Sequence, residues 1–240
     1  MQLERLLQQQ GFGARKQCRN LIRDGRFAIK GEIYDDPFHE IGDFPEGSEF
    51  SVDGTLWPYY AKAVILLNKP AGYECSRRAS HHPGVHTLLP QQLSNRALEC
   101  VGRLDVETTG LLLLTDDGQL LHQLISPKKK VAKLYRAELS EPLPEAARQQ
   151  LLAGIILKNE TTPTVAEAAE LDADSPRILY LTLSEGRYHQ VRRMLAAVGN
   201  HVEALSRVAI GALQLPADLP EGKWRWLGKN DLPLLWENRS

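Results

Sequence analysis

Residues 101–114 hold the feature that most constrains how this chain can fold. A turn signal at Gly102 is followed by the alternating pair Arg103 and Asp105, and then by the uninterrupted apolar run Leu111–Leu114. A short apolar run bounded by turn residues is typical of a strand that is buried on both faces. A carboxylate at the entrance of such a rigid strand can serve as a nucleophile or a general base. The alternative is a surface Arg–Asp pair that closes a loop.

Length and composition describe an ordinary globular chain. With 240 residues, of which 42% are hydrophobic and 25% charged, the chain can form one large domain or two unequal ones. It has no apolar run of about 18 residues, which a membrane span would need, and its start lacks a signal-peptide pattern. Its three cysteines are odd in number and far apart in the sequence, which argues against a disulfide framework. We therefore expect a cytoplasmic protein without a membrane partner.

The net charge of −1 conceals a segregation of charge near the N-terminus. Residues 1–30 carry seven Lys and Arg and two acids, whereas residues 31–56 carry eight acids and no Lys or Arg. The pattern predicts a short first helix, ended by Gly11–Gly13, and a second helix over 14–24. On the second helix the cations form one stripe beside an apolar face: Arg15, Lys16, Arg19 and Arg23. We favour RNA binding for this stripe over the alternative, the solvated face of an amphipathic helix.

This N-terminal part resembles the small RNA-binding module named after ribosomal protein S-four. The resemblance rests on segments 3–7, 14–26 and 29–32, which give two helices and a hairpin that turns near Lys30–Gly31. It implies that the basic helix, together with Arg26, lies against structured RNA. Pro58 and a change of composition mark the boundary. We expect a module over 1–57, a flexible linker over 58–62 and a second domain over 63–240, with a frayed end at 237–240.

Two further segments offer side chains for chemistry on RNA. Residues 128–137 carry five cations and no acid, and strand-like alternation places Lys133 and Tyr135 on one face. A phenol beside an ammonium group can stack on a nucleobase next to a phosphate contact; the alternative is an ordinary half-buried strand tyrosine. In the segment 184–198, Gly186 gives the backbone the freedom to turn just before a helix begins. Arg187 lies on this turn, and its side chain can point inward. His189 could act as an acid or base, although a structural or RNA-contacting role fits it better.

Four motifs in order resemble the pseudouridine synthases. They are residues 67–73, 102–118, 133–135 and 185–194, and with the N-terminal module they cover nearly the whole chain. The run 184–202, followed by Arg207 and Ile210–Gly211, resembles the branch that acts on small-subunit ribosomal RNA. The resemblance implies a mixed α/β (α+β) catalytic domain over 63–240, with an active cleft across a mainly antiparallel sheet. The implied reaction converts a specific uridine to pseudouridine, and the implied substrate is 16S ribosomal RNA.

The resemblance also implies roles for individual residues. Asp105 matches the catalytic aspartate and nucleophile, Tyr135 the aromatic that stacks on the target base, and Arg187 the basic partner of the aspartate. An adjacent guanidinium would favour the ionised carboxylate that the reaction needs. Whether Asp105 attacks C1′, attacks C6 or removes the C2′ proton is open. Residues expected to contact RNA are Arg15, Lys16, Arg19, Arg23, Arg26, Arg103, Lys128, Lys133, Arg192 and Arg193.

No metal and no cofactor are implied. The histidines downstream of Cys75 match no tight ligand spacing, so no metal site is expected there. The expected partner is ribosomal RNA in a pre-ribosomal particle, bound by a monomer. Two alternatives stay open: a synthase that acts on the large-subunit 23S RNA, and a non-catalytic RNA-binding factor of ribosome assembly.

Overall fold

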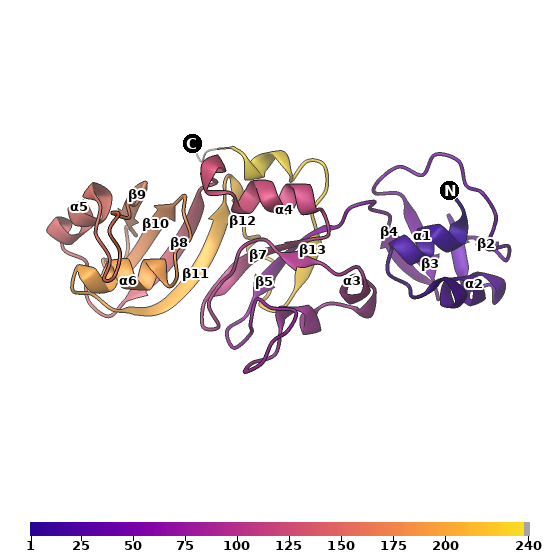
Figure 1. Ribbon diagram of the computed structural model, residues 1–240, viewed down its shortest axis with the longest axis horizontal. Helices are drawn as coiled ribbons and strands as arrows, with labels where there is room; N and C mark the ends of the chain where they lie inside the picture. Colours follow the sequence, from indigo (N-terminus) through magenta and orange to yellow (C-terminus); the bar gives the residue numbers. More distant parts are fainter. Residues whose placement is uncertain (238–240) are drawn as a thin grey trace.

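A computed structural model describes residues 1–237 and shows two units of unequal size. The expected frayed end at 237–240 falls, apart from Glu237, outside the described residues. Figure 1 shows the small N-terminal unit at one end of an elongated molecule and the larger unit extending away from it. Both units combine helices with a sheet, so the predicted mixed α+β class is confirmed. In residues 1–237 no helix has the length and apolar character of a membrane span.

The small unit packs two helices on a four-stranded antiparallel sheet. Helices α1 (Leu3–Gln9) and α2 (Arg15–Arg23) are joined by the predicted glycine turn, and the sheet order is β2-β1-β3-β4. The strands are β1 (Phe27–Ile29), β2 (Glu32–Tyr34), β3 (Glu49–Val52) and β4 (Thr55–Pro58). The hairpin turns at Lys30 and Gly31, both with positive φ, as a tight two-residue turn requires. Strand β4 was not predicted, because Pro58 was interpreted as the start of the linker.

The larger unit is built on a nine-stranded sheet. Its order is β13-β5-β7-β11-β8-β10-β9, with β6 beside β7 and β12 beside β11, and only β7 and β11 pair in parallel within residues 1–237. This confirms the mainly antiparallel sheet. The strands are β5 (Val64–Lys69), β6 (Glu99–Cys100), β7 (Thr109–Thr115), β8 (Lys133–Leu139), β9 (Ala168–Leu171), β10 (Ile178–Leu183), β11 (Val202–Ile210), β12 (Leu213–Gln214) and β13 (Trp224–Trp226).

Side chains of β7 enter both hydrophobic cores of the larger unit. Leu112 and Leu114 belong to one core, and Leu111 and Leu113 to the other, as expected for a strand buried on both faces. Helices α3 (Gln91–Asn95), α5 (Glu145–Ala153) and α6 (Gln190–Ala197) contribute to the first core, and α4 (Gly118–Ile125) to the second. Short 3₁₀ turns lie at 85–88, 127–129 and 233–235. The rigid strand predicted from Leu111–Leu114 is therefore confirmed.

The connection between the two units is held by hydrogen bonds. Arg96, whose side chain is 2% exposed, forms an ion pair with Asp116 at 2.8 Å. It also donates to the carbonyl oxygen of Tyr60 and to the side chain of Gln10, both at 2.9 Å. Gln10 in turn donates to Tyr60 at 3.0 Å. The segment predicted as a flexible linker is thus tied to both units, because a buried guanidinium gathers oxygen acceptors from each of them.

Candidate active site

A buried lysine holds the loop that carries Asp105 in place. Lys69, at the end of β5, is fully buried, and its ammonium group donates to the carbonyl oxygens of Val106 at 2.9 Å and Thr108 at 2.8 Å. Burial lowers the pKa of Lys69. The amide of Leu104 donates to Cys75 Sγ at 3.4 Å on the other side. The backbone is therefore held on both sides of Asp105, which keeps its carboxylate in place at the strand entrance.

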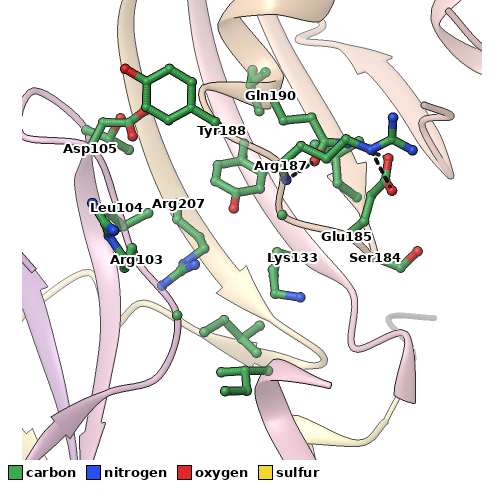
Figure 2. Close-up of a pocket in the computed structure, with 18 of the residues that line it drawn as sticks. Arg103, Leu104, Asp105, Lys133, Ser184, Glu185, Arg187, Tyr188, Gln190 and Arg207 are labelled. Carbon is green, nitrogen blue, oxygen red and sulfur yellow. Dashed lines mark hydrogen bonds and ion pairs between the residues drawn. The ribbon is translucent and has the colours of Figure 1, made fainter. Parts of the chain in front are cut away.

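Asp105 faces a cleft of about 620 Å³ in the larger unit. The lining comes from the β6–β7 connection, β8, the end of α4, the segment 183–191 and β11. These parts are spread over residues 101–210 and are brought together by the central strands of the sheet. Figure 2 shows Arg103, Lys133 and Arg207 along one part of the cleft and Asp105 at its edge. The structure thus has a cleft across the sheet where the active cleft was predicted.

The side chain of His189 lies within ion-pair distance of Asp105 in this structure. The distance between His189 Nε2 and Asp105 Oδ1 is 3.4 Å, and both side chains are more than a third exposed. His189 precedes α6 with a positive φ of 48°, which directs its ring toward the loop. The ring of Tyr188, which is 75% exposed, stacks on His189 at a centroid distance of 3.8 Å. Segment 183–191 therefore supplies a titratable group and an aromatic surface next to the carboxylate.

The expected pairing of Arg187 with Asp105 is wrong for this structure. Arg187 Nε donates to Glu185 at 3.1 Å, and its Nη1 forms an ion pair with Glu160. The carbonyl oxygen of Thr162 accepts a hydrogen bond from Nη1, and that of Pro163 accepts one from Nη2. The hydrogen bond from Arg187 lowers the pKa of Glu160. Figure 2 shows Arg187 directed toward Glu185 and away from Asp105, because the loop before β9 brings carboxylate and carbonyl oxygens that together occupy the guanidinium.

The central strands form the floor of the cleft, and they carry Tyr135 and Lys133. Both side chains come from β8 and line the cleft, so the predicted shared face is present. Tyr135 is 9% exposed and packs in the first core, which leaves part of its ring open to the cleft. Burial, and then the charge of Arg207, lower the pKa of Lys133 to about 8. Arg103 is exposed at the rim of the same cleft.

Arg207 is the most deeply buried cation of the floor. It lies on β11 opposite Tyr135 and beside Gly110 of β7, and it is 2% exposed. Its Nε donates to the carbonyl oxygen of Leu111 at 2.8 Å, whereas its Nη2 has no hydrogen-bond partner within residues 1–237. Gly110 has a φ of +99°, and a Cβ there would lie 2.3 Å from the carbonyl oxygen of Arg207. Glycine is thus needed for β11 to approach the strand that follows Asp105.

The other residues expected to contact RNA lie outside this cleft. Arg15, Lys16 and Arg23 are exposed on α2, as is Lys128 after α4. Arg19 is instead paired with Glu4, and Arg26 with Asp53 at 2.6 Å. In α6, Arg192 donates to the carbonyl oxygen of Val202, and Arg193 forms an ion pair with Glu160. No group of three or more potential metal-binding side chains is clustered within residues 1–237.

Known proteins resemble this chain over its full length. A family model described as RNA pseudouridylate synthase matches residues 63–197. The chain belongs to the RNA pseudouridylate synthase family. It is 38% identical to the "Ribosomal small subunit pseudouridine synthase A" of Escherichia coli strain K12, over 97% of this chain and 98% of that protein. The protein of the same name from Vibrio parahaemolyticus is 35% identical over 98% of this chain and all of its own length.

A solved structure supports the same family. A crystal structure of a pseudouridylate synthase is 35% identical and superposes with a TM-score of 0.68, covering 98% of this chain and 99% of that one. The chain is therefore a pseudouridine synthase, an intramolecular isomerase. Such an enzyme must break the N1–C1′ bond of a uridine, keep the uracil in place, and join its C5 to C1′. The cleft offers a carboxylate at its edge and an aromatic ring and cations on its floor.

Two residues of this synthase site were missed by sequence reasoning. Arg207 was recognised only as part of a family run, because an arginine in a strand of mixed polarity gives no local sign that it is buried. Glu160 lies in an irregular segment, 25 positions from the nearest motif, and no pattern connects it with Arg187.

Proposed function

We propose that this synthase converts a specific uridine of small-subunit 16S ribosomal RNA to pseudouridine. The observation that carries the proposal is the similarity to two small-subunit synthases over 97–98% of this chain, the N-terminal unit included. A catalytic domain alone would support only the reaction class. Similarity that continues through the module argues for the same kind of RNA as well, because modules outside the active site position the substrate.

Within this proposal Asp105 is the nucleophile and Tyr135 stacks on the target base. The base must leave its stack to reach the cleft, which costs a few kcal/mol. Stacking on an aromatic ring contributes about 1–3 kcal/mol per base and can offset much of that cost. Arg103 at the rim and Lys133 deeper in the cleft are placed to hold the flipped-out nucleotide. Arg187, which is occupied by Glu160 and Glu185, organises the wall of the site instead.

The N-terminal unit is proposed to dock on structured RNA outside the cleft. Its exposed cations Arg15, Lys16 and Arg23 lie on α2, at the end of the molecule remote from α6 (Figure 1). The hydrogen bonds around Arg96 hold this unit at a set position, so it can fix the distance between a docking site and the target uridine. We further propose that a monomer acts in the cytoplasm on a pre-ribosomal particle. Three free cysteines fit such a reducing compartment.

Pseudouridine mapping of ribosomal RNA tests the substrate. Both ribosomal RNAs are mapped in a strain that lacks this protein, and again after wild-type or Asp105→Asn protein is returned. The proposal expects one pseudouridine of the small-subunit RNA to disappear and to return only with the wild type. Loss of a large-subunit site would replace the proposed substrate. If the mutant protein restored the site, a role for Asp105 would be refuted, and if no site were lost, the assembly-factor alternative would gain support.

A further inference from the structure

The guanidinium of Arg207 is a buried cation with unused donors. Its side chain is among the largest that are fully buried, and its one hydrogen bond among the described residues runs from Nε to Leu111. Nη2 is shielded from solvent and has no hydrogen-bond partner in the part of the chain that the structure describes. A buried charge without partners costs several kcal/mol, so native proteins normally pair it. An arginine kept in this state is expected to have a partner that is absent from the free protein.

The carboxylates around the cleft do not supply that partner. Asp105 lies beside His189 at 3.4 Å. Glu185 is held by Arg187 and by Gln190, the latter at 2.8 Å. None of the ion pairs found in residues 1–237 includes Arg207. Lys133 is a second cation of the floor, and burial and then the charge of Arg207 lower its pKa. The floor therefore carries an excess of positive charge.

The depth of Arg207 indicates which part of a nucleotide it meets. A phosphodiester stays attached to the RNA backbone and remains near the mouth of the cleft, where the exposed Arg103 lies. A flipped base goes deeper, and it is the part that stacks on an aromatic ring. Arg207 is directly opposite Tyr135 in the β8–β11 ladder, and facing residues of an antiparallel pair share one side of the sheet. The guanidinium therefore lies at the level of the base.

We propose that Arg207 is a catalytic residue whose guanidinium donates a hydrogen bond to a carbonyl oxygen of the uracil while the base carries negative charge. When the N1–C1′ bond breaks, its electron pair stays with the uracil and is spread over N1, O2 and O4. When C5 joins C1′, C5 loses a proton and N1 gains one, so the product is an isomer. An initial attack at C6 would also place negative charge on O4. A preorganised cation in a water-poor site stabilises each of these species.

This inference rests on the family reaction and not on which ribosomal RNA is the substrate. The test therefore uses total RNA from a strain lacking the protein, which contains the unmodified target wherever it lies. Single-turnover rates of pseudouridine formation at saturating enzyme, RNA affinity and thermal unfolding are measured for four proteins: wild type, Arg207→Gln, Arg207→Lys and Arg103→Gln. The Gln variant removes the charge. The Lys variant keeps a positive charge but lacks the planar guanidinium group with its several N–H donors. Arg103→Gln is the matched control at the rim.

We expect Arg207→Gln to lower the single-turnover rate about 100-fold or more, the range found when one oxyanion donor is removed, with RNA affinity changed less than about threefold. Arg207→Lys should recover part of the rate. Arg103→Gln, which alters a contact at the rim and not on the floor, should weaken RNA binding more than Arg207→Gln does. Weaker binding at an unchanged rate for Arg207→Gln would overturn the proposal in favour of a phosphate contact. If the Gln and Lys variants lost the same amount of rate, and this loss matched the fraction of each protein that was unfolded, the proposal would be overturned in favour of a structural role.

Discussion

The arginines in the wall and in the floor of the cleft differ in whether they are paired with carboxylates. In the wall, formed by the segment 183–193, Arg187 and Arg193 share the carboxylate of Glu160. In the floor, formed by β7, β8 and β11, Arg207 is more deeply buried, yet among residues 1–237 it has one hydrogen bond and no carboxylate partner. The difference shows that burial alone does not decide whether a cation is paired. The wall uses its charges to hold irregular backbone together, whereas the floor keeps its charge available for the substrate.

The largest expected effect comes from disturbing the floor through its backbone. In Gly110→Ala the new methyl group would meet the carbonyl oxygen of Arg207 at a position with φ of +99°. Strained φ and overpacking each cost of order 1–3 kcal/mol. We expect Tm to fall by roughly 5–20 °C for a chain of this size, and the rate of pseudouridine formation to fall at least 100-fold, because β11 must move away from β7. Calorimetry and a single-turnover assay measure the two effects.

Gly186→Ala is the matched control in the wall. Nothing lies within 4 Å of a Cβ built at Gly186, and its φ is outside the positive range. We expect a Tm within about 2 °C of the wild type, as for most surface substitutions. If Gly186→Ala were as damaging as Gly110→Ala, the close approach of β11 to β7 would not be the reason for the floor's sensitivity.

The aromatic part of the floor gives the next largest effect. Tyr135→Ala removes the ring that is proposed to stack on the flipped base, at about 1–3 kcal/mol per base, so we expect kcat/KM to fall roughly 10- to 100-fold. Tyr135→Phe keeps the ring and should stay within a few-fold of the wild type. A Phe variant as impaired as the Ala variant would show that the hydroxyl, and not stacking, is what the reaction needs.

The N-terminal stripe is a second place, after the floor, where cations have no acidic partner among residues 1–237. Arg15 and Arg23 are exposed on α2, whereas the neighbouring Arg19 is paired with Glu4. The double variant Arg15→Gln/Arg23→Gln should weaken RNA binding and lower the slope of log Kd against log salt by about 0.7–0.9 for each lost phosphate contact. The rate at saturating RNA should not change. An unchanged slope would remove this stripe from the RNA-binding surface.

A smaller effect follows from the titration of Lys133. Burial and the charge of Arg207 lower the pKa of Lys133 from 10.5 to about 8, so this side chain loses its charge as pH rises from 7 to 9. We expect RNA affinity to fall a few-fold over this range in the wild type. In Lys133→Arg the fall should be absent, because arginine stays charged, and in Arg207→Gln it should move to higher pH. A profile that is the same in all three proteins would refute the coupling of the two cations.

The titration of Lys133 changes the free energy of unfolding in the direction opposite to its effect on RNA affinity. Its pKa in the folded state lies below that of the unfolded chain, so between about pH 8 and 10.5 the unfolded chain binds more protons. The contribution of this group to the free energy of unfolding therefore rises with pH through that window. Lys133→Met should remove the rise, which denaturant titrations at several pH values can measure.

Much of the fold followed from the sequence, because its strongest patterns are local. The alternation of Leu111–Leu114 between two cores, the hairpin at Lys30–Gly31 and the face shared by Lys133 and Tyr135 all depend on the period of a strand. The pairing of Arg187 could not be predicted in this way. It depends on Glu160, which a loop brings from another part of the chain. Residues that meet through tertiary structure leave no periodic signal, and Arg207 was overlooked for the same reason.

Replacement of Asp105 tests the central claim most directly, because the whole cleft is interpreted around this carboxylate. Purified wild-type and Asp105→Asn proteins are incubated with unmodified small-subunit ribosomal RNA, and pseudouridine formation and RNA binding are both measured. The substitution keeps the size of the side chain and removes its charge. We expect no detectable pseudouridine from Asp105→Asn and an RNA affinity within a few-fold of the wild type. Pseudouridine formation at the wild-type rate would contradict the account, because the nucleophile would then lie elsewhere.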